Sequence, residues 1–255
     1  MLKKDKINKK IIFLLLFFTT FLYSRVINIA VAANVSYAIP SLIKEFNKLH
    51  PDTKVKVTLG SSGKLTAQIS HGAPYDIFMS ANMDYPNALY ANKIAITKPI
   101  IYAQGGLAML SSRVKDFSKG LDLLMDKSIK KIAIANPKTA PYGKASLEVF
   151  KNTNIYKKIK HKLVYSESVS QTVSYALRAT DIGIVAKSSL YSSKMKRFKK
   201  GKHYTNIDIK YYTPIDQGLV ILKKAYQNPE VKNFYDFIKS AKAKNILKDY
   251  GYILP

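Results

Sequence analysis

The sequence predicts an α/β protein that folds into two lobes with a ligand cleft between them. From Val26 onward, short apolar segments typical of buried strands alternate with segments that have the apolar spacing of amphipathic helices. This order is typical of parallel sheets covered by helices. The alternation falls into two blocks of about 100 residues each, which is enough for a core in each block. Clefts at the carboxyl ends of such strands are where α/β proteins bind small ligands.

The first block predicts three strands and two helices. Apolar residues at positions 39, 42, 43 and 46 have the spacing of one helical face. In chain order, we expect a strand over 26–33, a helix over 34–50, a strand over 53–60, a short helix starting within 61–72 and a strand over 75–81.

The second block predicts a similar alternation, and the rest of the chain returns to the first lobe. The expected elements are strands over 106–112, 130–136, 162–167 and 181–188, helices over 142–153 and 168–179, a last strand over 217–224 and one helix from Pro229 that ends at Gly251. The sequence therefore assigns 25–105 to lobe 1, 106–215 to lobe 2 and 216–255 to a return segment of lobe 1.

Residues 1–24 have the pattern of a secretory signal peptide. Five lysines precede an apolar run from Ile11 to Leu22, and Ser24 follows as a small residue. The run is shorter than the roughly 20 residues that span a bilayer. The chain has no cysteine, which excludes disulfides, Cys-ligated metal sites and a lipid-modified cysteine. We expect an exported, periplasmic protein without a membrane anchor.

The net charge of +26 does not indicate nucleic-acid binding. Only four of the 42 basic residues are arginine, and arginine is the side chain that best matches phosphates and base edges. The lysines are spread along the chain, and we interpret them, Lys64 included, as a solvated surface.

Four predicted strand-to-helix junctions carry small, amide or hydroxyl residues. They begin at Ala33-Asn34, Gly60-Ser61-Ser62-Gly63, Asn136 and Ser166. The first N–H groups of a helix lack partners and carry a partial positive charge, so such ends bind anions. The alternative for each junction is an ordinary helix cap or turn. If the four ends converge across the cleft, they form a cage of neutral donors for a small tetrahedral oxyanion.

Five stretches carry a resemblance to a known family: VAANVSYAI, LGSSGKLTAQISHGAPYDIFMSAN, YAQGGLAML, ANPKTAPYGKA and SVSQTVSYAL. In this order, and with YGYILP at the end, they resemble the periplasmic molybdate-binding proteins of ABC importers over residues 26–255. The resemblance implies a type II periplasmic binding-protein fold, in which two Rossmann-like lobes are joined by two crossover strands. It implies no catalysis and no cofactor.

The resemblance also implies which residues hold the oxyanion of molybdenum or tungsten, without direct ligands to the metal. Asn34 matches a position that contributes a backbone N–H, with its side-chain amide as a second candidate donor. Ser62 matches a serine that offers its N–H and hydroxyl, and Ser61 is a further candidate. Tyr142 and Val169 match backbone donors of the second lobe.

One position departs from the family pattern. Ala33 stands where related sequences often have a hydroxyl residue. Either Ser36, which follows three positions later, compensates, or one hydrogen bond is missing.

The sequence therefore favours a monomeric periplasmic protein that delivers molybdate or tungstate to the permease of an ABC importer. Two alternatives stay open. One is a ferric-iron-binding protein of the same fold, suggested by Tyr211 and Tyr212, because paired phenolates ligate Fe³⁺. A serine hydrolase using Ser61 or Ser62 is the other, although His71 is the nearest base and no orienting group is evident.

Overall fold

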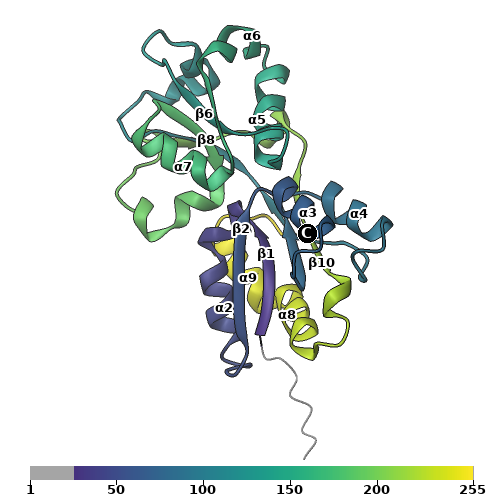
Figure 1. Cartoon of the computed structure of the whole chain (residues 1–255). Coiled ribbons are helices and arrows are strands. Elements are labelled where there is room, and N and C mark those ends of the chain that lie inside the picture. Colours follow the sequence, from purple (N-terminus) through teal and green to yellow (C-terminus); the bar gives the residue numbers. More distant parts are fainter. Residues whose placement is uncertain (1–25, 255) are drawn as a thin grey trace, which may run out of the picture.

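The computed structural model describes residues 26–254, which form two lobes built around one five-stranded sheet each (Figure 1). The predicted signal peptide lies outside the described residues. Within 26–254, no helix has both the length and the apolar character needed to cross a membrane.

The first lobe has the strand order β2-β1-β3-β10-β4. The strands β1 to β3 are parallel, and β10 runs antiparallel to both of its neighbours. Its strands are β1 (Val26–Ala32), β2 (Lys54–Gly60), β3 (Ile77–Ser80), β4 (Ile100–Gly105) and β10 (Ile215–Ile221). Its helices are η1 (Ala33–Tyr37), α2 (Ile39–Phe46), α3 (Ser62–Ser70), α4 (Asp84–Ala91), η7 (Lys223–Ala225), α8 (Pro229–Lys239) and α9 (Ala241–Asp249).

The second lobe has the strand order β7-β6-β8-β5-β9. Its strands are β5 (Leu107–Leu110), β6 (Ile132–Ala135), β7 (Leu163–Ser166), β8 (Ile182–Ala186) and β9 (Tyr204–Asn206). Its helices are η2 (Phe117–Met125), α5 (Pro141–Asn152), α6 (Tyr156–Ile159), η3 (Lys160–Lys162), α7 (Val169–Arg178), η4 (Lys187–Tyr191), η5 (Ser193–Met195) and η6 (Ile209–Tyr211).

Central strands are apolar on both faces because helices cover both sides of each sheet. In β6 and β8 every residue is buried, and β1 is buried throughout its second half. The apolar core of the second lobe continues across to Ala32, Ala33 and Ala81 of the first lobe. The lobes therefore pack against each other at the ends of β1 and β3.

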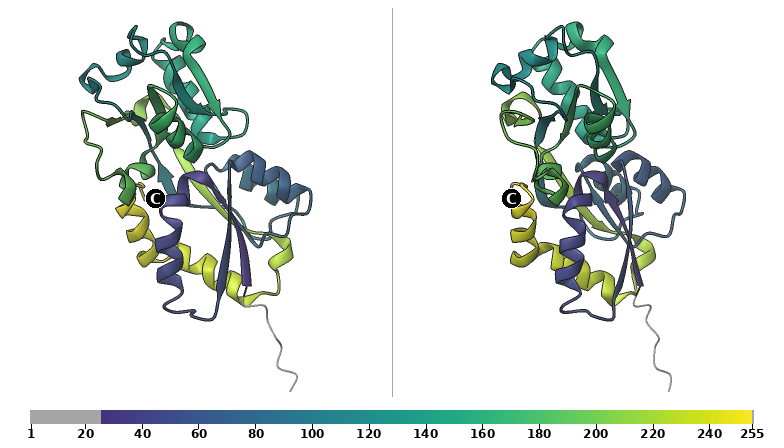
Figure 2. Two further views of the ribbon diagram at one scale, coloured as in Figure 1. Left: turned by 60° about the vertical axis from the view of Figure 1, so that its left-hand side comes forward. Right: turned by 90° about the vertical axis from the view of Figure 1, so that its left-hand side faces the viewer.

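Two crossover segments connect the lobes, as the fold class predicts. β4 runs through Gly106 into β5, and the chain returns between η6 and β10. The two crossovers are tied together, because the backbone N–H of Leu107 donates to the hydroxyl of Tyr212 at 3.0 Å. In both views of Figure 2, the yellow C-terminal helices lie in the same lobe as the purple N-terminal elements.

Two of the predicted helices are wrong in extent. The expected helix over 34–50 is a 3-10 helix, η1, followed by α2, which has Pro40 in its first turn. Proline has no N–H to donate and disfavours helical backbone before it, so one continuous helix cannot pass through this position. The expected helix from Pro229 to Gly251 is divided at Ser240, whose hydroxyl accepts from the N–H of Ala243 and caps α9.

Two strands, β4 and β9, and two α-helices, α4 and α6, were not among the elements expected from the sequence, nor were the 3-10 helices η2 to η7. β9 has three residues and α4 has only a weak apolar face, so neither presents a periodic signal. The segment of β4 contains Gln104 and Gly105 next to Gly106, a composition more typical of a turn.

Candidate functional site

The carboxyl ends of the parallel strands meet where the two lobes face each other. Ala32 at the end of β1 pairs with Gly60 at the end of β2, and Ala135 of β6 pairs with Ser166 of β7. The chain leaves β2 directly into α3, and α5 and α7 follow β6 and β7. The starts of these helices are therefore brought to the interface between the lobes.

A small cavity of about 10 Å³ lies at this interface. All five residues predicted from the sequence line it, and each is at most 4% exposed: Asn34, Ser61, Ser62, Tyr142 and Val169. The other lining residues are Ala32, Ala33, Gly60, Ala81, Ala140 and Pro141. Ser36 is not among the lining residues, so its hydroxyl does not compensate for Ala33.

Three backbone donors stand at helix starts. Ser62 and Val169 are the first residues of α3 and α7, and Tyr142 is the second residue of α5, after Pro141. N–H groups at these positions have no partner inside their own helix. The next N–H groups of α3 and α5 are occupied, because Gly63 donates to the carbonyl oxygen of Thr139 and Gly143 to that of Ala140. In these two helices the donor without such a bond therefore belongs to a residue that lines the cavity.

Gly143 allows α5 to begin close to the end of β6. A Cβ atom at this position would lie 2.2 Å from the carbonyl oxygen of Ala135, which is backbone and cannot move aside. Glycine is thus required for the first turn of α5, with Tyr142 in it, to reach the cavity.

The two serines of the GSSG stretch have different hydroxyl partners. The Ser62 hydroxyl accepts from the N–H of Ala81 at 2.9 Å, which leaves its own hydrogen available to donate. The Ser61 hydroxyl is buried without a hydrogen-bond partner, and it does not cap α3. The capping interpretation does hold for Ser168, whose hydroxyl accepts from the N–H of Gln171 at 3.4 Å.

The side-chain amide of Asn34 is already engaged in structural hydrogen bonds. Its Nδ2 donates to Oε1 of Gln217 at 2.7 Å and to the hydroxyl of Tyr252 at 2.9 Å. Its backbone carbonyl accepts from the hydroxyls of Ser188 at 2.9 Å and Tyr252 at 3.0 Å. Of the two donors expected at Asn34, the backbone N–H is the one not used by these bonds.

Gln217, Tyr252 and Ser188 support the site, and sequence reasoning missed their roles. They come from β10, from the segment after α9 and from η4, all far from Asn34 along the chain. The only sequence signal was the YGYILP ending, which contains Tyr252.

Among the residues that the structure describes, no carboxylate, lysine or histidine lines the cavity. The one titratable lining group is the Tyr142 phenol, and its burial raises the pKa well above the ordinary value. The hydroxyl therefore stays neutral at physiological pH. Within residues 26–254, no cluster of three or more acidic or histidine side chains could hold a metal ion.

The side chains that the two alternative functions need are not brought together at the cavity. The Tyr212 hydroxyl is tied to the N–H of Leu107, whereas Tyr211 lines a separate hollow of the second lobe. His71 is exposed, with Nδ1 2.7 Å from the carbonyl oxygen of Ala67, and it does not line the cavity that holds Ser61 and Ser62. Neither a phenolate pair nor a serine–histidine pair is assembled at the cavity.

Known proteins resemble this chain over nearly its whole length. Residues 27–253 match the family model of the bacterial extracellular solute-binding proteins. The molybdate-binding protein ModA of Azotobacter vinelandii is 32% identical over 230 residues, which cover 89% of each chain. ModA of Rhodobacter capsulatus is 33% identical and covers 88% of this chain and 86% of its own.

A solved structure agrees with the sequence comparisons. The Azotobacter vinelandii periplasmic molybdate-binding protein superposes with a TM-score of 0.84 at 30% identity, covering 90% of this chain and 99% of that one. The match spans both lobes and both crossovers, and the family is one of binding proteins rather than enzymes. The chain therefore belongs to the bacterial extracellular solute-binding protein family.

Proposed function

We propose that this protein captures molybdate or tungstate in the periplasm and delivers it to an ABC importer. One observation carries the proposal: residues of both lobes line a single buried cavity that offers neutral hydrogen-bond donors and no charged side chain. The molybdate-binding relatives from Azotobacter and Rhodobacter support the choice of anion.

In this proposal the anion is held by the N–H groups of Asn34, Ser62, Tyr142 and Val169 and by the hydroxyl of Ser62. Ser61 supplies a further hydroxyl, because its oxygen is buried and has no partner in the protein. Hydrogen bonds to a charged acceptor are stronger than those between neutral groups, so a few well-placed donors suffice. No group in the set contacts the metal atom, and no cofactor takes part.

The transport partner in this proposal is a permease in the inner membrane, and the binding protein acts as a monomer. The signal peptide at 1–24 directs export, so the mature chain begins near Arg25. N-terminal sequencing of the periplasmic fraction tests the cleavage, and light scattering of the purified protein tests the monomer.

Calorimetric titration of the mature protein with molybdate, tungstate and sulfate tests the function. We expect one site per chain, tight binding of molybdate and tungstate, and much weaker binding of sulfate. Absence of heat with molybdate and tungstate, in a sample shown to be folded, would overturn the proposal.

A further inference from the structure

A second, larger hollow adjoins the cavity at Ser61. It has a volume of about 500 Å³ and is lined from both lobes: by Ser61, Gly63, Lys64 and Ala67 of the first, and by Asn136, Thr139, Tyr165, Ser166 and Glu167 of the second. Ser61 lines the cavity and the hollow alike, so the hollow lies next to the proposed anion site.

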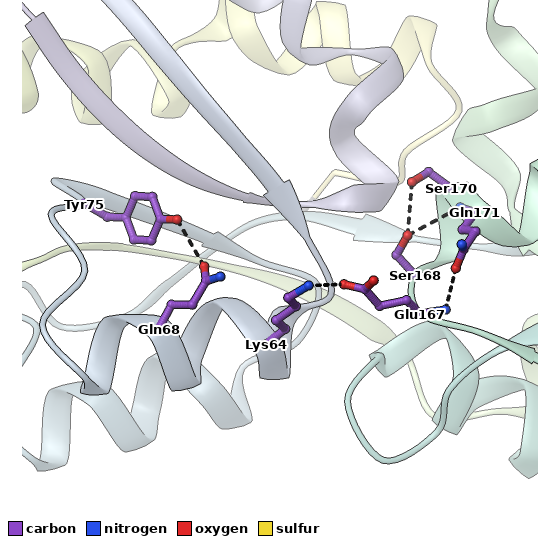
Figure 3. A network of polar contacts seen from close by, with 7 residues as sticks. All are labelled: Lys64, Gln68, Tyr75, Glu167, Ser168, Ser170 and Gln171. Carbon is purple, nitrogen blue, oxygen red and sulfur yellow. Dashed lines mark hydrogen bonds and ion pairs between the residues drawn. The ribbon is translucent and has the colours of Figure 1, made fainter.

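Two contacts join the lobes across this hollow. The backbone N–H of Gly63 donates to the carbonyl oxygen of Thr139 at 2.9 Å. The Nζ atom of Lys64 lies 2.6 Å from Oε1 of Glu167, and Figure 3 shows this ion pair between α3 and the loop before α7. If the lobes separate here, both contacts must break.

Gly63 permits this close approach because it has no side chain. A Cβ atom at Gly63 would lie 2.7 Å from the hydroxyl oxygen of Tyr85 in the same lobe, and 2.9 Å from the carbonyl oxygen and 3.0 Å from Cα of Thr139. The two Thr139 atoms are backbone atoms of the opposite lobe, so a methyl group would hold the two lobes apart. The Tyr85 hydroxyl is the end of a side chain, and only the contact with Thr139 depends on how the lobes are placed.

The cavity has a second neighbouring hollow of about 200 Å³, which shares Ala81 and Pro141 with it. That hollow is lined by Thr213, Pro214 and Ile215 of a crossover. The chain joins the lobes covalently on that side, so the lobes separate least there. The side of Ser61 and Lys64 is the one free to open.

We propose that the hollow beside Ser61 is the doorway of the site, and that Gly63–Thr139 and Lys64–Glu167 form the latch that closes it. The proposal rests on the proposed function. The Lys64 and Glu167 side chains are 52% and 56% exposed, so their pair alone contributes modestly. The two charges also flank the path of an anion, so each one alters the rate at which a dianion arrives.

The test is the kinetics of molybdate binding, measured by stopped-flow tyrosine fluorescence at low ionic strength. The chain has 18 tyrosines and no tryptophan, and Tyr142 lines the cavity. Lys64→Gln and Glu167→Gln both break the ion pair, so both should raise the dissociation rate by roughly 1.5- to 5-fold. The association rate should fall in Lys64→Gln, which leaves an unpaired negative charge, and rise in Glu167→Gln.

The controls remove the same charges elsewhere. Lys232→Gln and Asp236→Asn break an exposed pair on α8 and should leave both rates unchanged. Lys144→Gln breaks the Lys144–Asp84 pair beside the other hollow. The proposal is overturned if the opposite shifts in association rate are absent, or if Lys144→Gln produces the fall in association rate instead of Lys64→Gln.

Gly63→Ala tests the closed contact directly. It keeps the backbone N–H but adds the methyl group that meets Thr139, so molybdate affinity should fall by about tenfold or more. The variant is compared with its parent in a Tyr85→Phe background, which removes the hydroxyl nearest to the new methyl group. There the melting temperature of the anion-free protein should stay unchanged, because only the contact with Thr139 depends on closure. Unchanged affinity would contradict the latch. If wild-type protein binds no molybdate, the proposed function fails; if it binds and the variants behave like wild type, only the doorway fails.

Discussion

The hydroxyl of Tyr252 donates to the backbone carbonyl of Asn34 at 3.0 Å and accepts from the side-chain amide of the same residue at 2.9 Å. One hydroxyl thus fixes both the backbone and the side chain of a residue that lines the cavity. It ties the segment after α9 to η1, which begins the site in the first lobe.

Tyr252→Phe should destabilise the protein without abolishing anion binding. Both hydrogen bonds are lost, while Gln217 and Ser188 still hold Asn34. Two buried hydrogen bonds correspond to about 1–3 kcal/mol of the free energy of unfolding. Urea unfolding measures the change, with Tyr226→Phe at a 77% exposed position as the control. Equal stability of the two variants would show that the hydroxyl of Tyr252 has no such role.

Ser62→Ala should weaken molybdate binding by roughly 10- to 150-fold, because a hydrogen bond to a charged group contributes ~1.5–3 kcal/mol. The variant also leaves the buried N–H of Ala81 without its acceptor, so the anion-free protein should melt at a lower temperature. Calorimetry and thermal unfolding separate the two effects. Ser70→Ala, at the exposed end of the same helix, is the control. A Ser62→Ala variant with wild-type affinity would remove the hydroxyl from the proposed set of donors.

Affinity for molybdate should stay constant between about pH 6 and pH 9, a range in which histidine titrates and lysine does not. The lining holds neither residue, and the burial of Tyr142 moves the pKa of its phenol well above its usual position. No proton is therefore gained or lost by the lining across this range. Titrations at four pH values in one background salt test the expectation. A steep loss of affinity above pH 6.5 would place a protonated imidazole in the site.

The rise in the thermal unfolding midpoint on ligand binding should differ among the tetrahedral anions. Phosphate carries a proton near neutral pH, and in a site made of donors its O–H group would face another donor, an unmade bond that costs ~1–3 kcal/mol. Molybdate and tungstate carry no proton and avoid this cost.

At 1,000 times the dissociation constant, ligand adds ~4 kcal/mol to the free energy of unfolding. Each kcal/mol raises the midpoint by ~2–4 °C for a chain of this size. We expect a rise of about 8–16 °C with molybdate and tungstate, a small rise with sulfate and none with phosphate. Equal shifts with phosphate and molybdate would contradict a site made of donors alone.

The convergence of the predicted site residues could be anticipated because helix starts have a local signature. Ser62 follows a glycine and a serine at the end of a strand, and Tyr142 follows a proline, which favours the first turn of a helix. Parallel strands then bring these starts to one edge. Chemistry that depends on three or four neighbouring residues can be predicted from sequence.

Contacts between distant segments could not be anticipated in this way. Asn34 meets Gln217 across 183 positions and Tyr252 across 218, and no local pattern links them. Lys64 illustrates the same limit. The sequence interpretation makes it a solvated lysine, and its side chain is half exposed, yet it is paired with Glu167 of the opposite lobe.

The position of β10 between β3 and β4 sets the order in which the chain can fold. Among the strands of residues 26–254, β4 pairs only with β10, and its one further bridge joins Gln104 to Ile253, later still in the chain. β3 lacks its second neighbour until residues 215–221 arrive. All strands of the second lobe lie in the continuous stretch 107–206. Pairing of distant strands is slow because the intervening chain must first be ordered. We therefore expect refolding in two phases, with the second lobe first. During synthesis and export, β3 and β4 stay available for other partners until most of the chain has been made.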